Sequence, residues 1–515
     1  METSNASTVE VKMDLFGRSV LTVNPPDVLD AKSVGEILNK VMPKHKKNSE
    51  DIAYLDAFRR GNQPILYRKK TIRPEIKNIV VENRAAEVVE FKVGYEFAKP
   101  PIYTNVGENE SAPIGMLNTY ERLDNRDSKI IELARNFFTY GTAYSICLPN
   151  LNPTIDEAPY YTDILDSGST FVVYSSEVGK KPLLAGKYVK RKAINKKTNK
   201  EEDVTVYGVY TDTHFYTWQM PEDKDDFVKE KPVNTESNTV NMIPIVEYSL
   251  NDSRLGYVEL CMHLFNAINT VGSNRLDGIE QFIQSLLVFI NCELPTDEDG
   301  KKHIPKSGEA IDIKGNGALT PDVKYLIAQL DQSQAQVTKE DLLNAMYEIS
   351  GVPSRADRRS GGDTGQAVVL RDGWGAAESR AKSTEKPFEK ADKESLKIKL
   401  HICRNIGEYA KEIEGLTLRD IGLSFQRTRS DNMQVKAQTL QMLNDSGVHP
   451  ELTYEVSELF NDPVAAFKKS LAWQKSGDAH WVARNQRMAR KLPDKDDKAQ
   501  TKGEDETAKE IVVEE

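Results

Sequence analysis

The longest helical pattern in the chain lies between Gly351 and Ile413. The stretch opens with the glycine- and arginine-rich segment GVPSRADRRSGGDTGQ and then predicts one helix of about 45 residues, roughly 65 Å long. Pro387 has no N–H for the carbonyl of Ser383, so we expect a kink there. The expected buried stripe consists of Leu370, Trp374, Ala377, Ala381, Phe388, Ala391, Ile398, Ile402, Ile406, Tyr409 and Ile413.

Shorter periodic stretches come before this helix. From 142 to 248 the period shifts toward two, which predicts strands, and a charged insert at 191–202 is expected to form a hairpin tip. Together, residues 26–252 are expected to form one α+β domain. The predicted helices are 26–41, 49–59, 73–97 and 126–140, the last ended by Gly141. The predicted strands are 142–148, 170–175, 183–190, 203–210 and 214–218.

The middle of the chain predicts a stalk with a small β insert. A helical stripe at 253–287 and a second one at 332–350 flank a segment with strand-like runs. Two helices would therefore carry a knob between them. The expected strands of the knob are 286–294, 309–313 and 323–328. After the long helix we expect a strand at 416–425, helices at 432–444 and 451–460, and disorder from about 487.

The composition is that of a folded protein with a charged surface. The chain has 515 residues, 39% of them hydrophobic and 29% charged, and this length exceeds one compact core, so several subdomains are expected. The formal net charge of -10 argues against a nucleic-acid clamp, because duplex binding depends on neutralising phosphates. Transient handling of nucleic acid stays compatible with this charge.

Nothing in the sequence indicates a secreted or membrane protein. The four cysteines are far apart, and no cysteine or histidine pair has zinc-ligand spacing, which is typical of reduced intracellular cysteines. No apolar run approaches the roughly 18 residues of a membrane span. The first residues lack a basic-then-apolar signal pattern. We therefore expect the protein to be made and to work in the cytoplasm, without contact with a membrane.

The motifs of common enzyme classes are missing from the sequence. It contains no GxxxxGKS/T phosphate loop and no HExxH, GxSxG or GxGxxG. The glycine-rich residues 361–365 lack the lysine and the preceding strand of a nucleotide site. The seven histidines are dispersed, and Asp363 and Asp372 fit capping or solvent-facing roles better than a catalytic pair. We therefore expect no catalysis, no cofactor and no metal site.

Several phrases between about residue 70 and residue 470 occur together, in the same order, in one known family. Helix 78–97 is followed by AKPPIY, and a later pair of strands reads TFVVYSSEVGKKPLLAGKYV. NMIPIVEYSLND precedes the first stalk helix, GVP and SGGDTGQAVVLR precede the long helix, and PELTYEVSELFNDPVAAFKK follows it. In these phrases the chain resembles the SPP1-like portal proteins of tailed bacteriophages. Its loop of three arginines is more basic than the family pattern.

This resemblance implies an α+β portal architecture with an α/β wing, a two-helix stem, a small β clip, a long kinked helix and a helical crown. It also implies a ring, usually a dodecamer, at one capsid vertex of the virion, after assembly in the host cytoplasm. Double-stranded DNA would be packaged and later ejected through this ring. The implied partners are the terminase large subunit, head-completion and adaptor proteins, and the major capsid and scaffolding proteins.

The resemblance divides the chain into nine segments. These are the N-terminal arm 1–25, wing 26–252, first stem helix 253–285, clip 286–331, second stem helix 332–352, tunnel loop 353–365, long kinked wing helix 366–415, crown 416–486 and a disordered charged tail 487–515.

Two of these segments supply the candidate site residues. Glycines make a loop tip adaptable, and arginines contact phosphates weakly and in a salt-sensitive way. The arginines of the tunnel loop could equally pair with acidic residues of a neighbouring subunit. The clip residues could meet an acidic face of the motor or form a solvated loop. The tunnel-loop candidates are Arg355, Arg358, Arg359, Ser360, Gly361, Gly362 and Gly365. The clip candidates are Lys301, Lys302, His303 and Lys306.

Two other classes of function stay open at this point. One is a capsid adaptor or scaffold protein without a DNA channel, and the other is a nucleic-acid-processing enzyme. The enzyme would need a metal or nucleotide site, which the sequence does not offer. The order of stalk helix, knob and stalk helix, followed by a loop and a long helix, favours the portal over the adaptor.

Overall fold

The computed structural model describes most of the chain, in two compact units. The first unit comprises Met1–Tyr103 and Ala112–Thr428, and the second comprises Thr104–Ser111 and Arg429–Glu515. Helices and sheets are mixed, as expected for an α+β protein. The described residues are 15–106, 112–194, 201–221, 224, 226–283, 286–291, 320, 322–326, 332–354, 373–425, 433–457, 459–460 and 463–476.

Four sheets are present among the described residues. The largest has the order β1-β5-β6-β7-β8-β9, in which β1 runs parallel to β5 and every other pair is antiparallel. The others have the orders β10-β3-β4, β11-β12 and β13-β2. The strands are β1 (Leu21–Val23), β2 (Ile102–Asn105), β3 (Thr142–Pro149), β4 (Tyr160–Leu165), β5 (Thr170–Ser175), β6 (Pro182–Ile194), β7 (Glu201–Tyr210), β8 (His214–Pro221), β9 (Asn234–Ser237), β10 (Ile245–Ser249), β11 (Leu286–Ile290), β12 (Asp322–Leu326) and β13 (Ile421–Ser424).

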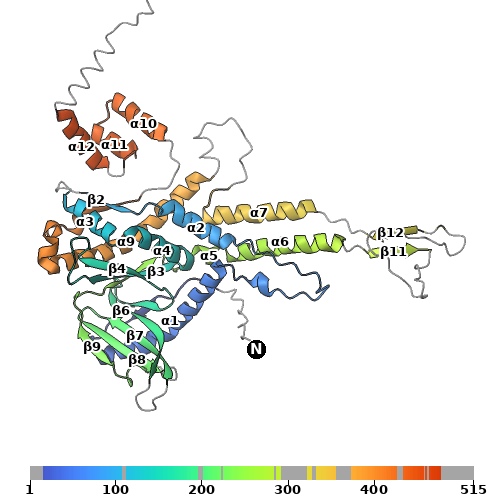
Figure 1. Ribbon diagram of the computed structural model, residues 1–515, viewed down its shortest axis with the longest axis horizontal. Helices are drawn as coiled ribbons and strands as arrows, with labels where there is room; N and C mark the ends of the chain where they lie inside the picture. Colours follow the sequence, from blue (N-terminus) through green and yellow to red (C-terminus); the bar gives the residue numbers. More distant parts are fainter. Residues whose placement is uncertain are drawn as a thin grey trace, which may run out of the picture. The chain divides into compact units, whose positions relative to one another are not determined.

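Most of the helices lie beside these sheets, and two of them build a stalk that leads to the β11–β12 pair (Figure 1). In the first unit they are α1 (Ala31–Arg59), α2 (Arg84–Glu96), α3 (Ala112–Leu123), α4 (Arg126–Tyr140), α5 (Tyr257–Leu260), α6 (Met262–Ile283), α7 (Gln332–Ser350) and α9 (Trp374–Ile406). The same unit has 3-10 turns at Pro64–Tyr67, Gly407–Ile413 and Leu418–Asp420. In the second unit the described helices are α10 (Met433–Asp445), α11 (Pro450–Ser457) and α12 (Pro463–Lys475).

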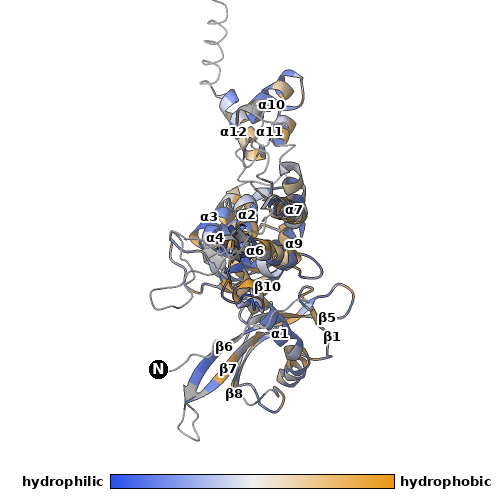
Figure 2. Cartoon of the chain, turned by 90° about the vertical axis from the view of Figure 1, so that its right-hand side faces the viewer, coloured by the Kyte–Doolittle hydropathy of each residue, from blue (hydrophilic) through white to orange (hydrophobic). Residues whose placement is uncertain are grey.

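Helix α1 is a single helix, whereas the sequence pattern predicted two. Asp30 and Ser33 form a capping box at its start, and Pro43 lies inside it. The prediction failed because His45 and Asn48 occupy the buried face between the two apolar stretches, so the stripe continues through polar residues. Figure 2 shows α1 lying along the large sheet, where Leu38 and Val41 join the same core cluster as Trp218.

Helix α2 starts at Arg84, eleven residues later than predicted for the stretch 73–97. Asn83 has a φ of 42°, which breaks the helix. Before it, residues 73–76 form a turn and residues 76–83 belong to neither a helix nor a strand. The apolar residues Ile76 and Val80 fit a helical spacing, but their segment packs against α6 instead. Helix α3 was not predicted at all.

The charged insert between β6 and β7 is shorter than predicted. Both strands continue into 191–202, and Ile194 pairs with Glu201. Lys192 lies directly opposite Asp203, and opposite charges in such positions stabilise exposed strands. The polar composition of 191–202 predicted a loop, but cross-strand pairs extend the two strands into this insert.

The long helix α9 contains Pro387 and ends at Ile406, before the predicted end at Ile413. A 3-10 segment at Gly407–Ile413 follows, in which Ala410 has a φ of -137°. The first residues predicted for the long helix, 366–372, lie outside the described residues. The expected strand at 309–313 and the tail from 487 also lie outside them. Of the strand predicted at 416–425, only β13 forms, because Thr417 and Asp420 fold the preceding residues into a capped turn.

Candidate functional site

The predicted site residues all lie outside the described part of the chain. The tunnel-loop candidates are Arg355, Arg358, Arg359, Ser360, Gly361, Gly362 and Gly365, and the clip candidates are Lys301, Lys302, His303 and Lys306. The structure instead describes the segments that hold both ends of the loop and both helices of the stalk.

The loop leaves α7 through a tightly specified helix end. Gly351 has a φ of 68°, and the N–H of Val352 donates to the carbonyl of Tyr347 at 3.1 Å. This is a Schellman arrangement, in which a glycine adopts the left-handed conformation after the last helical turn. Val352 and Tyr347 are both buried, as the accompanying hydrophobic contact requires. The exit of the chain from α7 is therefore fixed by backbone geometry.

The two ends of the loop meet. A Cβ built on Gly373 would lie 3.7 Å from the Cα of Pro353, so the chain returns to the point from which it left. Arg380 of α9 covers Gly351 and donates from Nη1 to the carbonyl of Ile349. The described residues on the two sides of 355–372 therefore lie next to each other in space.

The start of α9 is held against α2. The Trp374 ring lies 5.7 Å from that of Tyr95 and 6.1 Å from that of Phe91, measured between centroids. Tyr95 donates its hydroxyl proton to Glu378 at 2.7 Å, and Ala377 and Ala381 are completely buried below it. The small residues let the two helices approach closely, so the second end of the loop is also rigid.

The stalk consists of α6 and α7, which lie side by side (Figure 1). Arg275 of α6 donates to the Gln336 side chain of α7 at 2.8 Å. Two residues separate α6 from β11, which pairs antiparallel with β12, and five residues separate β12 from α7. The predicted order of helix, β insert and helix is therefore present among the described residues.

Residues 68–83 pass along α6, and we call them the strap. The strap turns at Arg73, which has a φ of 52°, and the N–H of Ile76 donates to the carbonyl of Arg73 at 3.1 Å. The backbone N–H groups of its alternate residues Asn78, Val80 and Glu82 donate to side chains of α6, at 2.7, 3.0 and 2.9 Å. The three acceptors are Asp277, Ser273 and Asn269.

This ladder works because two repeats coincide. Two residues of an extended chain advance about 6.6 Å, and four residues of a helix advance about 6.0 Å. Each second N–H of the strap therefore meets the next acceptor on one face of α6. These backbone N–H groups of the strap are bonded to side chains of α6, so they are not available for a helix at 73–83. This explains the late start of α2.

A buried ionic cluster ties α9 to α3 and α4. Glu121 accepts from Lys399 Nζ at 2.8 Å and from Arg126 at 2.9 Å, and Arg126 also reaches Asp392 at 3.1 Å. All four side chains are less than 10% exposed. Burial alone would raise the pKa of Glu121, but Lys399 and Arg126 outweigh it and lower this pKa from 4.5 to about 2. Two cations facing two anions make a structural cluster.

A second group of polar side chains in the described part of the chain is also paired internally. An open hollow of about 900 Å³ lies between α1, α4 and β6. Inside it, Asp56 accepts from the Tyr140 hydroxyl at 3.1 Å and pairs with Arg59 at 3.0 Å. Among the described residues, no group of three or more histidine, cysteine, aspartate or glutamate side chains is arranged to hold a metal ion.

The fold and the stalk are matched by one known family. The chain matches the family described as "Phage portal protein, SPP1 Gp6-like" over residues 39–474, which runs from α1 to α12. The chain belongs to this phage portal protein family. No curated protein matches the chain significantly.

Membership in the portal family places the chain among structural proteins of the virion, at the capsid vertex. No described helix is long and apolar enough to cross a membrane. The sequence predicted the two stalk helices of this portal protein, but it did not reveal the strap, the contact between Pro353 and Gly373 or the buried ionic cluster. The tunnel loop stays a prediction. The positive φ of Gly351 could have been anticipated from a glycine directly after a helical pattern.

Substitution of Gly351 by alanine should destabilise the portal subunit by about 1–2 kcal/mol, because alanine resists the left-handed conformation. The added methyl group would also displace Arg380. Chemical denaturation of the two proteins measures the difference. Gly375→Ala is the matched control, since a Cβ there meets nothing within 4 Å and lies in α9, where alanine should be neutral or stabilising. Equal stability of both variants would contradict the fixed loop exit.

Proposed function

We propose that copies of this portal protein close into a ring, usually a dodecamer, that conducts double-stranded DNA during packaging and ejection. The observation that carries this proposal is the family match over 39–474 together with a two-helix stalk followed by an anchored loop. A closed ring requires heterologous contacts whose rotation returns to the starting subunit. The conduit needs no catalysis of its own, since the motor would be a separate protein.

In this proposal the segments take the roles that the family resemblance implied. Residues 26–252 and the long helix α9 build the wing, α6 and α7 build the stem, and the β11–β12 segment belongs to the clip. The loop after α7 faces the DNA, and the residues after 416 form the crown. The terminase large subunit, and later head-completion and adaptor proteins, would dock on the clip, and the capsid and scaffolding proteins would surround the ring.

The anchoring of the loop supports a role at the DNA. Its two described ends, Pro353 and Gly373, lie next to each other and are held by packed helices. Arginines on such a loop can contact passing phosphates, each contact being weak and sensitive to salt. Weak contacts suit a channel in which DNA has to slide.

Reversing two loop charges tests this role. In the variant Arg358→Glu with Arg359→Glu, we expect rings of normal size but at least about ten-fold less packaged or retained DNA, because each lost phosphate contact weakens the hold. Nuclease-protected DNA per particle is the measurement. The control Lys382→Glu with Lys386→Glu makes the same charge change on exposed residues of α9. Normal packaging by the loop variant would exclude the loop as the DNA contact.

Reversal of clip charges tests the docking part separately. The variant Lys301→Glu, Lys302→Glu and Lys306→Glu should weaken binding of the terminase large subunit to preformed rings, because rim charges govern association rates. Unchanged terminase binding, measured by surface-based binding kinetics, would assign these residues to a solvated loop.

A further inference from the structure

The outer side of the strap is basic. Residues Asn78, Val80 and Glu82 donate to α6, whereas Ile79 between them and Lys77 just before them are exposed. The exposed residues of the strap also include Lys69, Ile72 and Arg73. Arg73 has one exposed ion pair within the strap, with Glu75 at 3.4 Å. Exposed pairs of this kind contribute little and leave the guanidinium available.

Helix α7 carries an acidic stripe on its exposed side. The stripe consists of Val337, Asp341, Asn344 and Glu348, which recur at spacings of four, three and four and therefore share one face. Asp341, Asn344 and Glu348 are exposed, and Val337 is 57% exposed. Neither Asp341 nor Glu348 has an ion-pair partner within the described part of the chain.

The strap and the stripe lie on opposite sides of the stalk. Lys339 of α7 forms an ion pair with Glu82 of the strap. Asp341 and Glu348 are rotated by about 160–180° from Lys339 around a helix of 3.6 residues per turn. Figure 1 shows the same order, with α6 between α7 and the segment that contains the strap. Neither surface can reach the other within one chain.

The two surfaces complement each other in charge and in apolar content. Lys77 and Arg73 of the strap offer positive charge beside Ile72 and Ile79, which are 77% and 41% exposed. The stripe offers two carboxylates beside an exposed valine. The two carboxylates of the stripe are about 10 Å apart along α7, and the two cations of the strap flank its turn at 73–76. Exposed apolar residues rimmed by charges are typical of a contact surface.

We propose that the strap of one subunit docks on the α7 stripe of the next subunit in the ring. This inference rests on the proposed ring and specifies one of its contacts. Because the two surfaces are different and lie on opposite sides of the stalk, the contact is heterologous and passes from subunit to subunit until the ring closes. Each interface pairs Arg73 and Lys77 with Asp341 and Glu348.

Charge reversal with rescue tests the contact in the full-length protein. The strap variant is Arg73→Glu with Lys77→Glu, and the stripe variant is Asp341→Lys with Glu348→Lys. We expect each variant to raise the protein concentration needed for ring assembly at least about ten-fold, because like charges then face each other at every interface. The combined variant should restore assembly. Native mass spectrometry and negative-stain electron microscopy measure the ring fraction.

The control Lys46→Glu with Lys47→Glu makes the same charge change on exposed residues of α1 and should assemble like the wild type. Rings from both single-surface variants at wild-type concentrations would overturn the contact while leaving the ring in place. A combined variant that fails to recover would overturn the pairing as well. If the strap variant assembles normally but loses DNA binding, the basic surface serves DNA, and the subunit contact is wrong. A wild-type protein that forms no ring would instead remove the proposed function itself.

Discussion

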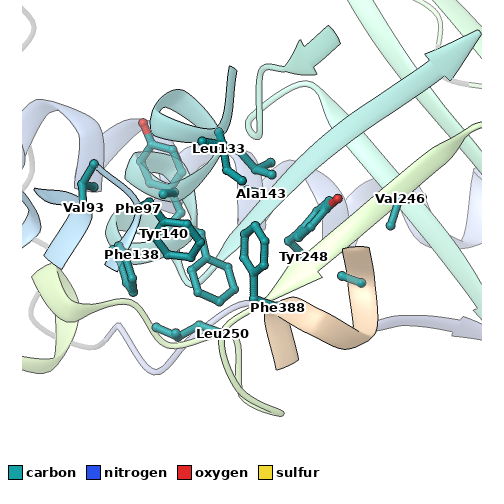
Figure 3. Packing of buried hydrophobic residues seen from close by; sticks show 14 of the residues in the cluster. Val93, Phe97, Leu133, Phe138, Tyr140, Ala143, Val246, Tyr248, Leu250 and Phe388 are labelled. Carbon is teal, nitrogen blue, oxygen red and sulfur yellow. The ribbon is translucent and has the colours of Figure 1, made fainter. Parts of the chain in front are cut away.

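Replacement of Phe388 by alanine should lower the free energy of unfolding by about 3–5 kcal/mol. The side chain is fully buried, and its ring centroid lies 4.7 Å from that of Phe97 and 5.0 Å from that of Tyr248. Figure 3 shows Phe388 projecting from α9 into this cluster, next to Tyr248. The neighbouring rings come from the residue that follows α2 and from β10, so they cannot all move to fill the cavity.

Urea denaturation at neutral pH measures this loss, and the slope of the transition shows whether the same surface unfolds. Phe16→Ala is the matched control, because Phe16 is 81% exposed and the same truncation there should change stability by less than about 0.5 kcal/mol. If Phe388→Ala cost no more than the control, α9 would not be packed into the core as described.

Replacement of Glu121 by leucine should cost a similar amount, about 3–5 kcal/mol, for a different reason. Without its carboxylate, Lys399 loses its ion pair with Glu121, and Arg126 retains its ion pair with Asp392. An unpaired buried charge keeps its desolvation penalty and gains nothing in return. Glu394→Leu is the control, because its pair with Lys397 is exposed and 4.0 Å long, and it should change stability by under about 1 kcal/mol.

The pH dependence separates this charge effect from poor packing of the leucine. The pKa of Glu121 is lowered from 4.5 to about 2 in the folded protein, so its contribution is fully present above pH 4.5 and is lost as the pH falls toward 2. The stability difference between wild type and Glu121→Leu should therefore shrink over this range. A difference that stays constant down to pH 3 would indicate a packing defect alone.

The sequence predicted those elements whose pattern is set by local spacing. Helix α4 and helix α7 have the predicted limits, and β5 spans the predicted residues. In α4 the apolar stripe is uninterrupted, and Gly141 ends the helix with a φ of 73°. In such segments, the buried face and the helix-ending residue can both be read locally.

Elements whose pattern depends on tertiary partners could not be predicted in this way. His45 and Asn48 of α1 are polar residues on a buried face, so the helix looked interrupted. The strap fits a helical period but binds α6 through its backbone, and no local signal distinguishes the two. Tertiary contacts overrode the local preference in both cases.

The candidate site was predicted only as far as its chain order. The contact between Pro353 and Gly373 and the pairing of Glu121 with Lys399 join residues that are distant in the sequence, the latter by 278 positions. A single sequence gives no spacing for such pairs. The tunnel-loop and clip residues therefore stay predictions that rest on the family and on the described anchors of the loop.

We propose above that this portal protein closes into a ring with a central passage. Negative-stain electron microscopy of the purified full-length chain, with native mass spectrometry on the same sample, tests it most directly. We predict rings with a central hole and a mass close to twelve times the 57.9 kDa chain. Compact monomers or dimers under conditions in which the subunit is folded would contradict the ring, and the strap contact with it.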